Sequence, residues 1–424
     1  MREIPSSTIV DSPLLDVILK GLNDDTSFDA AVDCMCTLYL DTREVDDSLS
    51  VIQTLYPRVM SLRPKIAEFA ASEDTDGFKG VTRLFAEAGE AWVVLIARIP
   101  TQFRGLVEAV LECCARDFER DAISLTFLFW YELKQYVTLE RYMEARVQCS
   151  DVYSKLVDVM VNHLQYPAPE EGESDLFGGD REQEEKFRQF RHAMGDVLKD
   201  CCSVIGVTEC LQKTYNRIEQ WVSKYAAQST NEEVLHWQEL EAPLFGLRAM
   251  GRMVDPENSS VLGQMIPLIV QIPDQEKVRF QAIMALARYT EWTAQHPETL
   301  EAQLNYVISG FQHSSQEVVQ AAALAFQFLG TDCRKLLGGY ISQLHTFFES
   351  VLDRLKPASK EEVTEGVAAV VSVQPLDKIY ETMKLFCDPI MARIMNLANN
   401  AKDEREQRAV AGKYSMTEKK KKHR

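Results

Sequence analysis

The fold is decided by the segment EKVRFQAIMALARY, residues 276–289. Five of its apolar residues lie at positions i, i+4, i+7, i+8 and i+11: Val278, Ala282, Ala285, Leu286 and Tyr289. That spacing places them on one face of an α-helix. Just before the helix, Asp274 offers a carboxylate to backbone amides that have no partner within the first turn. The segment is therefore expected to be an amphipathic helix that buries one face against a neighbour.

The same pattern recurs as pairs of amphipathic helices at a spacing of roughly 39 to 64 residues, close to the pitch of HEAT-type repeats. The first helix of each pair is expected to begin near Ser27, Gly77, Asp121, Glu184, Glu232, Glu276, Gln316 and Lys360. One pair cannot bury its own apolar face, whereas stacked pairs share one elongated core. Alternating strand patterns are almost absent, so we predict an all-α protein. The expected architecture is a HEAT-like α-solenoid, a right-handed superhelix of antiparallel helix pairs.

A chain of 424 residues would ordinarily divide into two or three domains, but a solenoid needs no such division. We expect one continuous array of about eight helix pairs over residues 1–400, with an acidic loop at 167–185. Residues 401–424 are expected to form a poorly ordered basic tail. Its end, Lys419 to Arg424, is either a nuclear-localisation signal or an accidental end of the reading frame.

No membrane insertion or export is expected from the sequence. The longest apolar segment, residues 91–99, is too short to cross a bilayer. The N-terminus lacks the three zones of a signal peptide. The ten cysteines have no disulfide-like spacing, so they are expected to be free thiols in a reducing, intracellular compartment.

The formal net charge of −18 bears on the choice of partners. A strongly acidic body repels nucleic acid and attracts basic proteins, so direct nucleic-acid binding is not expected and basic protein partners are. The candidate partner-binding residues are carboxylates in the acidic loop and in one later turn: Glu170, Glu171, Glu173, Asp175, Asp180, Asp255 and Glu257. Alternatively, the loop is a tolerated solvated insertion, and Asp255 serves a helix start ahead of Pro256.

Catalytic and cofactor motifs are missing from the sequence. The cysteine pairs lack the spacing of a zinc site, and the seven histidines are isolated. Neither a phosphate-binding loop nor a Gly-x-Ser-x-Gly elbow occurs. We therefore expect no catalytic residues, no cofactor, no metal and no enzymatic activity.

Several segments together carry a family resemblance. The stretch FRQFRHAMGDVLKDCCSVIGVTECL, residues 187–211, resembles the central region of karyopherin-β import receptors of the transportin-SR branch, which includes the fungal mRNA-transport regulators. In those receptors an acidic loop also precedes a Phe-Arg-x-x-x-x-Asp-Leu-x-Lys-Asp pattern. The similarity extends to four further segments: TFLFWY (126–131), VDPEN (254–258), residues 279–286 and QPLDKI (374–379).

This resemblance implies a nuclear import receptor that shuttles between cytoplasm and nucleus as a monomer. Its implied partners are basic cargo of the SR-type or mRNA-binding class, the GTPase Ran and Phe-Gly nucleoporins, with cargo released by Ran-GTP. Family members are considerably longer, and the similarity fades beyond about residue 402, so only the central part of the receptor is expected here, with impaired Ran-dependent release. The alternative is a HEAT-repeat scaffold subunit that assembles an enzyme complex such as a phosphatase. Such scaffolds tend to have repeats of near-constant length, whereas the repeats here vary.

Overall fold

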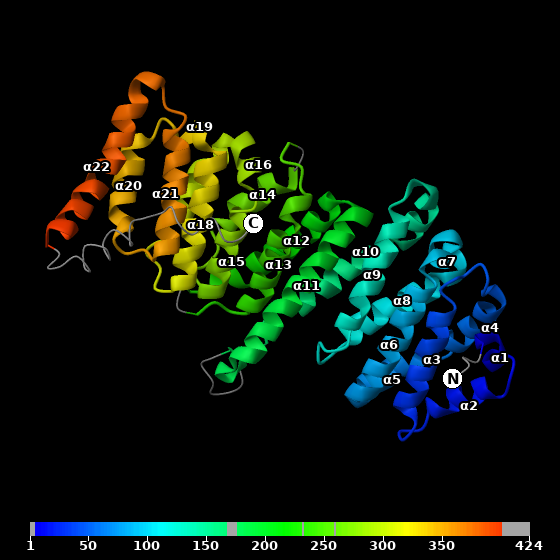
Figure 1. Ribbon diagram of the computed structural model, residues 1–424. Helices are drawn as coiled ribbons and strands as arrows, with labels where there is room; N and C mark the ends of the chain where they lie inside the picture. The colour runs from blue at the N-terminus through cyan, green and yellow to red at the C-terminus, as the bar shows by residue number, and fades with distance from the viewer. Residues whose placement is uncertain (1–4, 168–175, 231–232, 258–259, 401–424) are drawn as a thin grey trace. The chain divides into compact units, whose positions relative to one another are not determined.

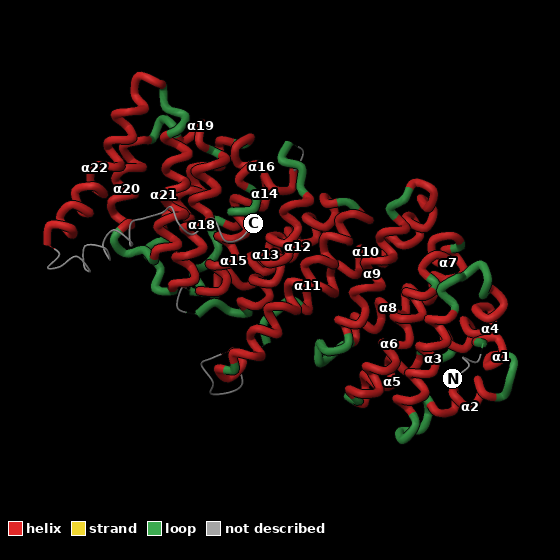
Figure 2. The backbone as a smooth tube through the Cα atoms, in the orientation of Figure 1, coloured by secondary structure: helices red, strands yellow, loops and turns green. Residues whose placement is uncertain are grey.

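The computed structural model describes residues 5–167, 176–230, 233–257 and 260–400. Within these ranges all regular structure is helical, as Figure 1 and Figure 2 show. The all-α class predicted from the sequence is therefore confirmed. None of the helices in the described ranges is long and apolar enough to cross a membrane.

The helices group into two compact units, residues 1–285 and 286–424, and each is described by itself. The expectation of one continuous array over residues 1–400 stays a prediction. The predicted tail, residues 401–424, lies outside the described residues.

The first unit holds helices α1 to α14 and nearly all of α15. Their bounds are α1 Ser6–Val10, α2 Leu14–Gly21, α3 Phe28–Asp41, α4 Leu49–Met60, α5 Pro64–Ser72, α6 Thr75–Ala91, α7 Val93–Arg98, α8 Pro100–Arg116, α9 Phe127–Val137, α10 Met143–His163, α11 Arg181–Ile205, α12 Val207–Tyr225, α13 Trp237–Met250, α14 Ser260–Ile269 and α15 Glu276–Leu286. Short 3-10 turns lie between them: η1 Ile123–Thr126, η2 Glu140–Tyr142, η3 Leu176–Gly179, η4 Ala226–Gln228 and η5 Gly251–Met253.

The second unit holds the remaining helices. Their bounds are α16 Thr290–Gln295, η6 Pro297–Thr299, α17 Leu300–Gly310, α18 Gln316–Asp332, α19 Arg334–Leu337, α20 Ile341–Leu352, α21 Pro357–Val371 and α22 Leu376–Asn400.

In the first unit the helices form two rows. The first helices of successive pairs, α3, α6, α9, α11 and α13, each contact the next one in the row. The second helices α8, α10, α12 and α14 do the same. This stacking buries the apolar face of each helix, because the apolar side chains of one pair pack against those of the next pair. For example, the Trp92 indole is fully buried and donates a hydrogen bond to Thr42 Oγ1 at 2.8 Å, 50 residues earlier in the chain.

In the second unit, α18 and α21 make an unusually close crossing. A Cβ atom built on Gly330 would lie 2.6 Å from the carbonyl oxygen of Gly366. A side chain at Gly330 would collide with backbone that cannot move aside, whereas a Cβ at Gly366 would lie 3.1 Å from the Gln327 Cα and the Phe326 carbonyl oxygen, a tight contact.

Candidate functional site

Within the acidic loop, residues 167–185, the structure describes residue 167 and residues 176–185. Glu170, Glu171, Glu173 and Asp175 lie outside the described residues. Asp180 is the N-cap of α11: its Oδ1 accepts hydrogen bonds from the amides of Glu182 and Gln183 at 2.8 and 3.3 Å. A carboxylate in this place stabilises the helix through both the cap and the helix dipole. A contact between Asp180 and a partner remains a prediction.

The other two candidate carboxylates share one turn. Asp255 Oδ1 accepts a hydrogen bond from the amide of Glu257 at 3.0 Å, which closes a turn after η5. Pro256 and Glu257, which follow it, lie in a turn, so Asp255 shapes that turn ahead of α14. The structure thus joins Asp255 to Glu257, whereas Asp180 lies at the start of α11.

An aromatic cluster holds the described residues on either side of 168–175 together. The Tyr166 ring, at the end of the chain entering the loop, lies 5.3 Å from Phe187 and 5.5 Å from Trp237, measured between ring centroids. The Phe177 ring, within the loop, lies 5.4 Å from Phe187. Because Phe187 belongs to α11 and Trp237 to α13, the cluster ties the loop to two successive first helices.

A buried ion pair lies next to this aromatic cluster. The cluster and the ion pair together are called the base of the loop. Arg191 Nη2 donates to both carboxylate oxygens of Glu241, at 2.8 and 2.7 Å, and the two side chains are only 4% and 2% exposed. The guanidinium also lies 4.6 Å from the Tyr166 ring centroid and 4.2 Å from that of Phe245. Burial raises the pKa of Glu241, and the charge of Arg191 opposes that rise. The pair therefore links α11 to α13 in a place that water does not reach.

Arg120 fixes the entering end of the loop. Its backbone has a positive φ of 62°, and its Nη1 donates to the Gln165 carbonyl at 2.7 Å. Its guanidinium lies 5.8 Å from the Phe187 ring centroid. The segments just before and just after the loop are therefore held against one rigid base.

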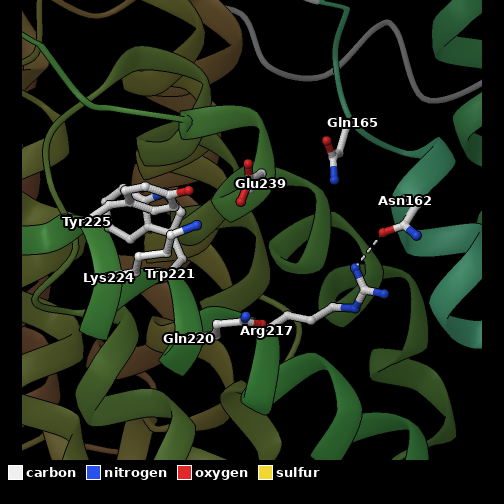
Figure 3. Close-up of a pocket in the computed structure, with 8 residues that line it drawn as sticks. All are labelled: Asn162, Gln165, Arg217, Gln220, Trp221, Lys224, Tyr225 and Glu239. Atoms are coloured by element: carbon white, nitrogen blue, oxygen red, sulfur yellow. Dashed lines mark hydrogen bonds between the residues drawn. The ribbon is translucent and has the colours of Figure 1, made fainter.

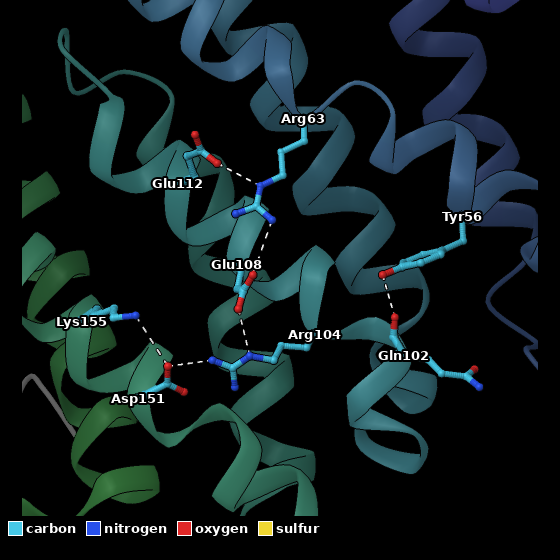
Figure 4. A network of polar contacts seen from close by, with 8 residues as sticks. All are labelled: Tyr56, Arg63, Gln102, Arg104, Glu108, Glu112, Asp151 and Lys155. Atoms are coloured by element: carbon cyan, nitrogen blue, oxygen red, sulfur yellow. Dashed lines mark hydrogen bonds and ion pairs between the residues drawn. The ribbon is translucent and has the colours of Figure 1, made fainter.

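A second polar feature runs along the second helices, as Figure 4 shows. Arg63 binds Glu112 on α8 at 3.0 Å, and Arg104 of α8 binds Asp151 on α10 at 2.7 Å. The members of this polar ladder are Arg63, Glu108, Glu112, Arg104, Asp151 and Lys155. All six side chains are partly exposed, so each pair contributes less than about 1 kcal/mol, but shared carboxylates couple neighbouring repeats.

Metal-binding clusters and cysteine reactivity are two chemical features that bear on catalysis in the described residues. They contain no group of three or more His, Cys, Asp or Glu side chains arranged to hold a metal ion. The ten cysteines are free thiols, eight of them buried. Burial raises the pKa of Cys114 and of Cys149 to about 11, which is opposite to what a nucleophile needs.

The base of the loop was not predicted from the sequence, although a signal exists. Arg191 and Glu241 are 50 residues apart, as are Arg83 and Asp33. Arg104 and Asp151 are 47 apart. These separations approximate one repeat, so a search for a cation and a carboxylate one repeat apart would have found all three pairs.

Comparison with known families gives two matches. Residues 73–163 match the family model described as the second TPR domain of transportin-3/importin-13, and residues 259–347 match the model of its third TPR domain.

Curated relatives are similar over nearly the whole chain. The uncharacterized protein C11G11.07 of Schizosaccharomyces pombe is 42% identical over 402 residues, covering 93% of this chain and 42% of the relative. The mRNA transport regulator MTR10 of Saccharomyces cerevisiae is 36% identical over 399 residues, covering 90% of this chain and 39% of the relative. The chain thus spans about two-fifths of the length of these relatives.

Among solved structures, importin-13 in its cytosolic state superposes with a TM-score of 0.78 at 14% identity. The match covers 97% of this chain and 49% of importin-13. At that identity the likeness concerns the fold alone, and it confirms the predicted HEAT-like solenoid class.

Proposed function

Because the chain belongs to the karyopherin-β family, in the branch of the fungal mRNA transport regulator MTR10, we propose that it binds basic protein cargo for transport into the nucleus. The observation that carries this proposal is the 36% identity to an mRNA transport regulator over 90% of the chain. The cargo class is that of mRNA-binding or SR-type proteins, whose basic segments complement a net charge of −18.

The acidic loop and its base form the proposed cargo contact. Arg120 and the Tyr166 cluster hold the described residues on either side of 168–175, and these form a fixed platform for the proposed contact. Fixing the platform before binding reduces the entropy that association costs. The proposed contact residues are Glu170, Glu171, Glu173, Asp175 and Asp180, with Asp255 and Glu257 as a second group.

The proposed function also includes release of the cargo and passage of the receptor through the nuclear pore. The GTP form of Ran displaces cargo in the full-length receptor, and the receptor crosses the nuclear pore through weak contacts with Phe-Gly nucleoporins. Cargo and Ran would each favour a different arrangement of the repeats, which is the differential affinity that such coupling requires. The chain acts as a monomer, without cofactor or enzymatic activity, without membrane insertion and without direct contact to nucleic acid. We expect Ran-dependent release to be impaired in this chain taken alone.

The test is capture of an Arg-rich RNA-binding protein on the immobilised chain, with and without excess Ran-GTP. Changing Glu170, Glu171, Glu173 and Asp175 to their amides should weaken capture. The control removes the same charge from four exposed carboxylates elsewhere: Glu68, Glu144, Glu298 and Glu301. Equal binding by the two variants would refute the loop contact. Recovery of a stoichiometric enzyme instead of cargo would favour a scaffold, and full release by Ran-GTP would contradict the impaired release.

A further inference from the structure

A small cavity lies in the first unit, where α10 ends beside α12 and the start of α13. It has a volume of about 270 Å³ and is lined by Asn162, Gln165, Arg217, Gln220, Trp221, Lys224, Tyr225 and Glu239. A water molecule takes about 30 Å³ in the liquid, so this space has more than enough room for one charged side-chain head but is smaller than most cofactor sites.

The walls of the cavity are held in place. The buried Trp221 indole donates to the carbonyl oxygens of Leu235 and His236, both at 3.1 Å, which fixes the segment before α13. The Tyr225 ring lies 4.6 Å from the His236 ring, measured between centroids. Arg217 is fixed as well, because its Nη1 donates to Asn162 Oδ1 at 2.7 Å. A ligand would therefore meet side chains that are already ordered.

The charge of this place differs from that of the chain as a whole. Arg217 and Lys213 share one carboxylate, that of Asp158, at 3.2 and 2.7 Å. Lys224 lies 4.5 Å from the Tyr225 ring centroid, and its ammonium points toward the same space as Glu239 and the Gln165 amide, as Figure 3 shows. Among the lining residues, the two cations Arg217 and Lys224 outnumber the one carboxylate, Glu239, so the lining carries a formal net charge of +1 in a protein whose total is −18.

We propose that this cavity binds an oxyanion carried by a partner protein, a phosphate or a carboxylate, through Lys224, Arg217 and the neighbouring carboxamides. Ammonium, guanidinium and amide N–H groups are the donors that such anions require. Glu239 opposes the anion and limits its affinity. The site is distinct from the acidic loop and has the opposite sign, so it adds recognition of an acidic or phosphorylated residue to whatever the loop binds.

The experiment measures anisotropy of labelled glycine-rich peptides that differ in one central residue: phosphoserine, glutamate or serine. Low salt is used, and inorganic phosphate serves as a competitor. The intact chain should bind the anionic peptides and not the serine peptide. Binding of phosphoserine alone identifies a phosphate as the ligand, and binding of both anionic peptides extends the site to carboxylates. Equal binding of all three peptides, or of none, overturns the proposal.

Two variants test the site itself. Lys224→Met keeps the aliphatic stem but removes the charge, and it should weaken binding about tenfold. Glu239→Gln removes the opposing charge and should strengthen binding, a gain that a merely structural role would not produce. The matched control is Lys155→Met on α10, whose lysine is 67% exposed and paired with Asp151. Unchanged binding in both Lys224→Met and Glu239→Gln would overturn the assignment.

Discussion

Replacing Arg191 by methionine should destabilise the link between α11 and α13. Methionine keeps the apolar stem but takes from the Glu241 carboxylate, 2% exposed, its hydrogen-bonded cation, and leaves only the weaker attraction of Lys277 and Arg248. Removing one partner of a buried ion pair costs about 3 to 5 kcal/mol. The matched control is Arg188→Met on the same helix, whose arginine is 68% exposed and binds Glu185. That change should cost less than about 1 kcal/mol.

The loss should depend on pH in a defined direction. Burial already raises the pKa of Glu241, and without Arg191 that pKa rises further. A carboxyl whose folded-state pKa is raised is tolerated as the neutral acid and penalised once it ionises. The Arg191→Met protein should therefore be most destabilised at neutral and alkaline pH and should recover part of its stability as the pH falls toward the ordinary pKa of glutamate.

The assay is native-state hydrogen exchange of the amides of α11 and α13, because a repeat protein need not unfold in one step. A loss of about 3 kcal/mol should speed their exchange by about two orders of magnitude. Adding Glu241→Met to Arg191→Met removes the unpaired charge and should restore most of the protection. The reasoning is refuted if the Arg191 and Arg188 variants exchange alike, or if the second substitution restores nothing.

Three further outcomes follow from the structure. Burial raises the pKa of Glu90 to about 7, so its ionisation lowers stability as the pH rises from the ordinary glutamate pKa to about 7, and the full loss is present above that pH. Glu90→Gln should stabilise the fold by about 1 kcal/mol at alkaline pH, after allowance for solvent screening, and by almost nothing at acidic pH. Urea unfolding curves measured at the two pH values check this. Gly330→Ala should cost about 2 to 3 kcal/mol in thermal unfolding, because the new methyl meets the Gly366 backbone, whereas Gly339→Ala, with nothing within 4 Å, should be near neutral. Arg104→Met should cost about 1 kcal/mol in dilute buffer and less at high salt, because its two carboxylate partners are exposed enough to be screened.

The helix pairs could be predicted because their signal is local. The apolar periodicity of each helix can be read from its own residues. Helices α15 and α18 begin at Glu276 and Gln316, as expected. Helix α13 was expected from about Glu232 but begins at Trp237. The later start of α13 has a tertiary cause. His236 has a positive φ of 50°, which is not helical, and its carbonyl oxygen accepts a hydrogen bond from the Trp221 indole.

The candidate site could be predicted only in part. Asp180 was selected for its charge, and the structure gives it the role of a helix cap. Arg191 and Glu241 were overlooked because charged residues on an apolar face look like interruptions of the pattern. Only the register between two successive first helices brings that arginine and that glutamate together, and periodicity within one helix carries no information about it.

The crossing of α18 and α21 has a mechanical consequence. Most helix contacts are made by side chains that can change rotamer and let one helix slide over another. At Gly330 and Gly366 the contact is backbone against backbone, and backbone atoms have no such freedom. We therefore expect α18 and α21 to move together as one rigid pair. Bending of the second unit is expected at its other helix contacts, such as those of α20 and α22, and not at the crossing of α18 and α21.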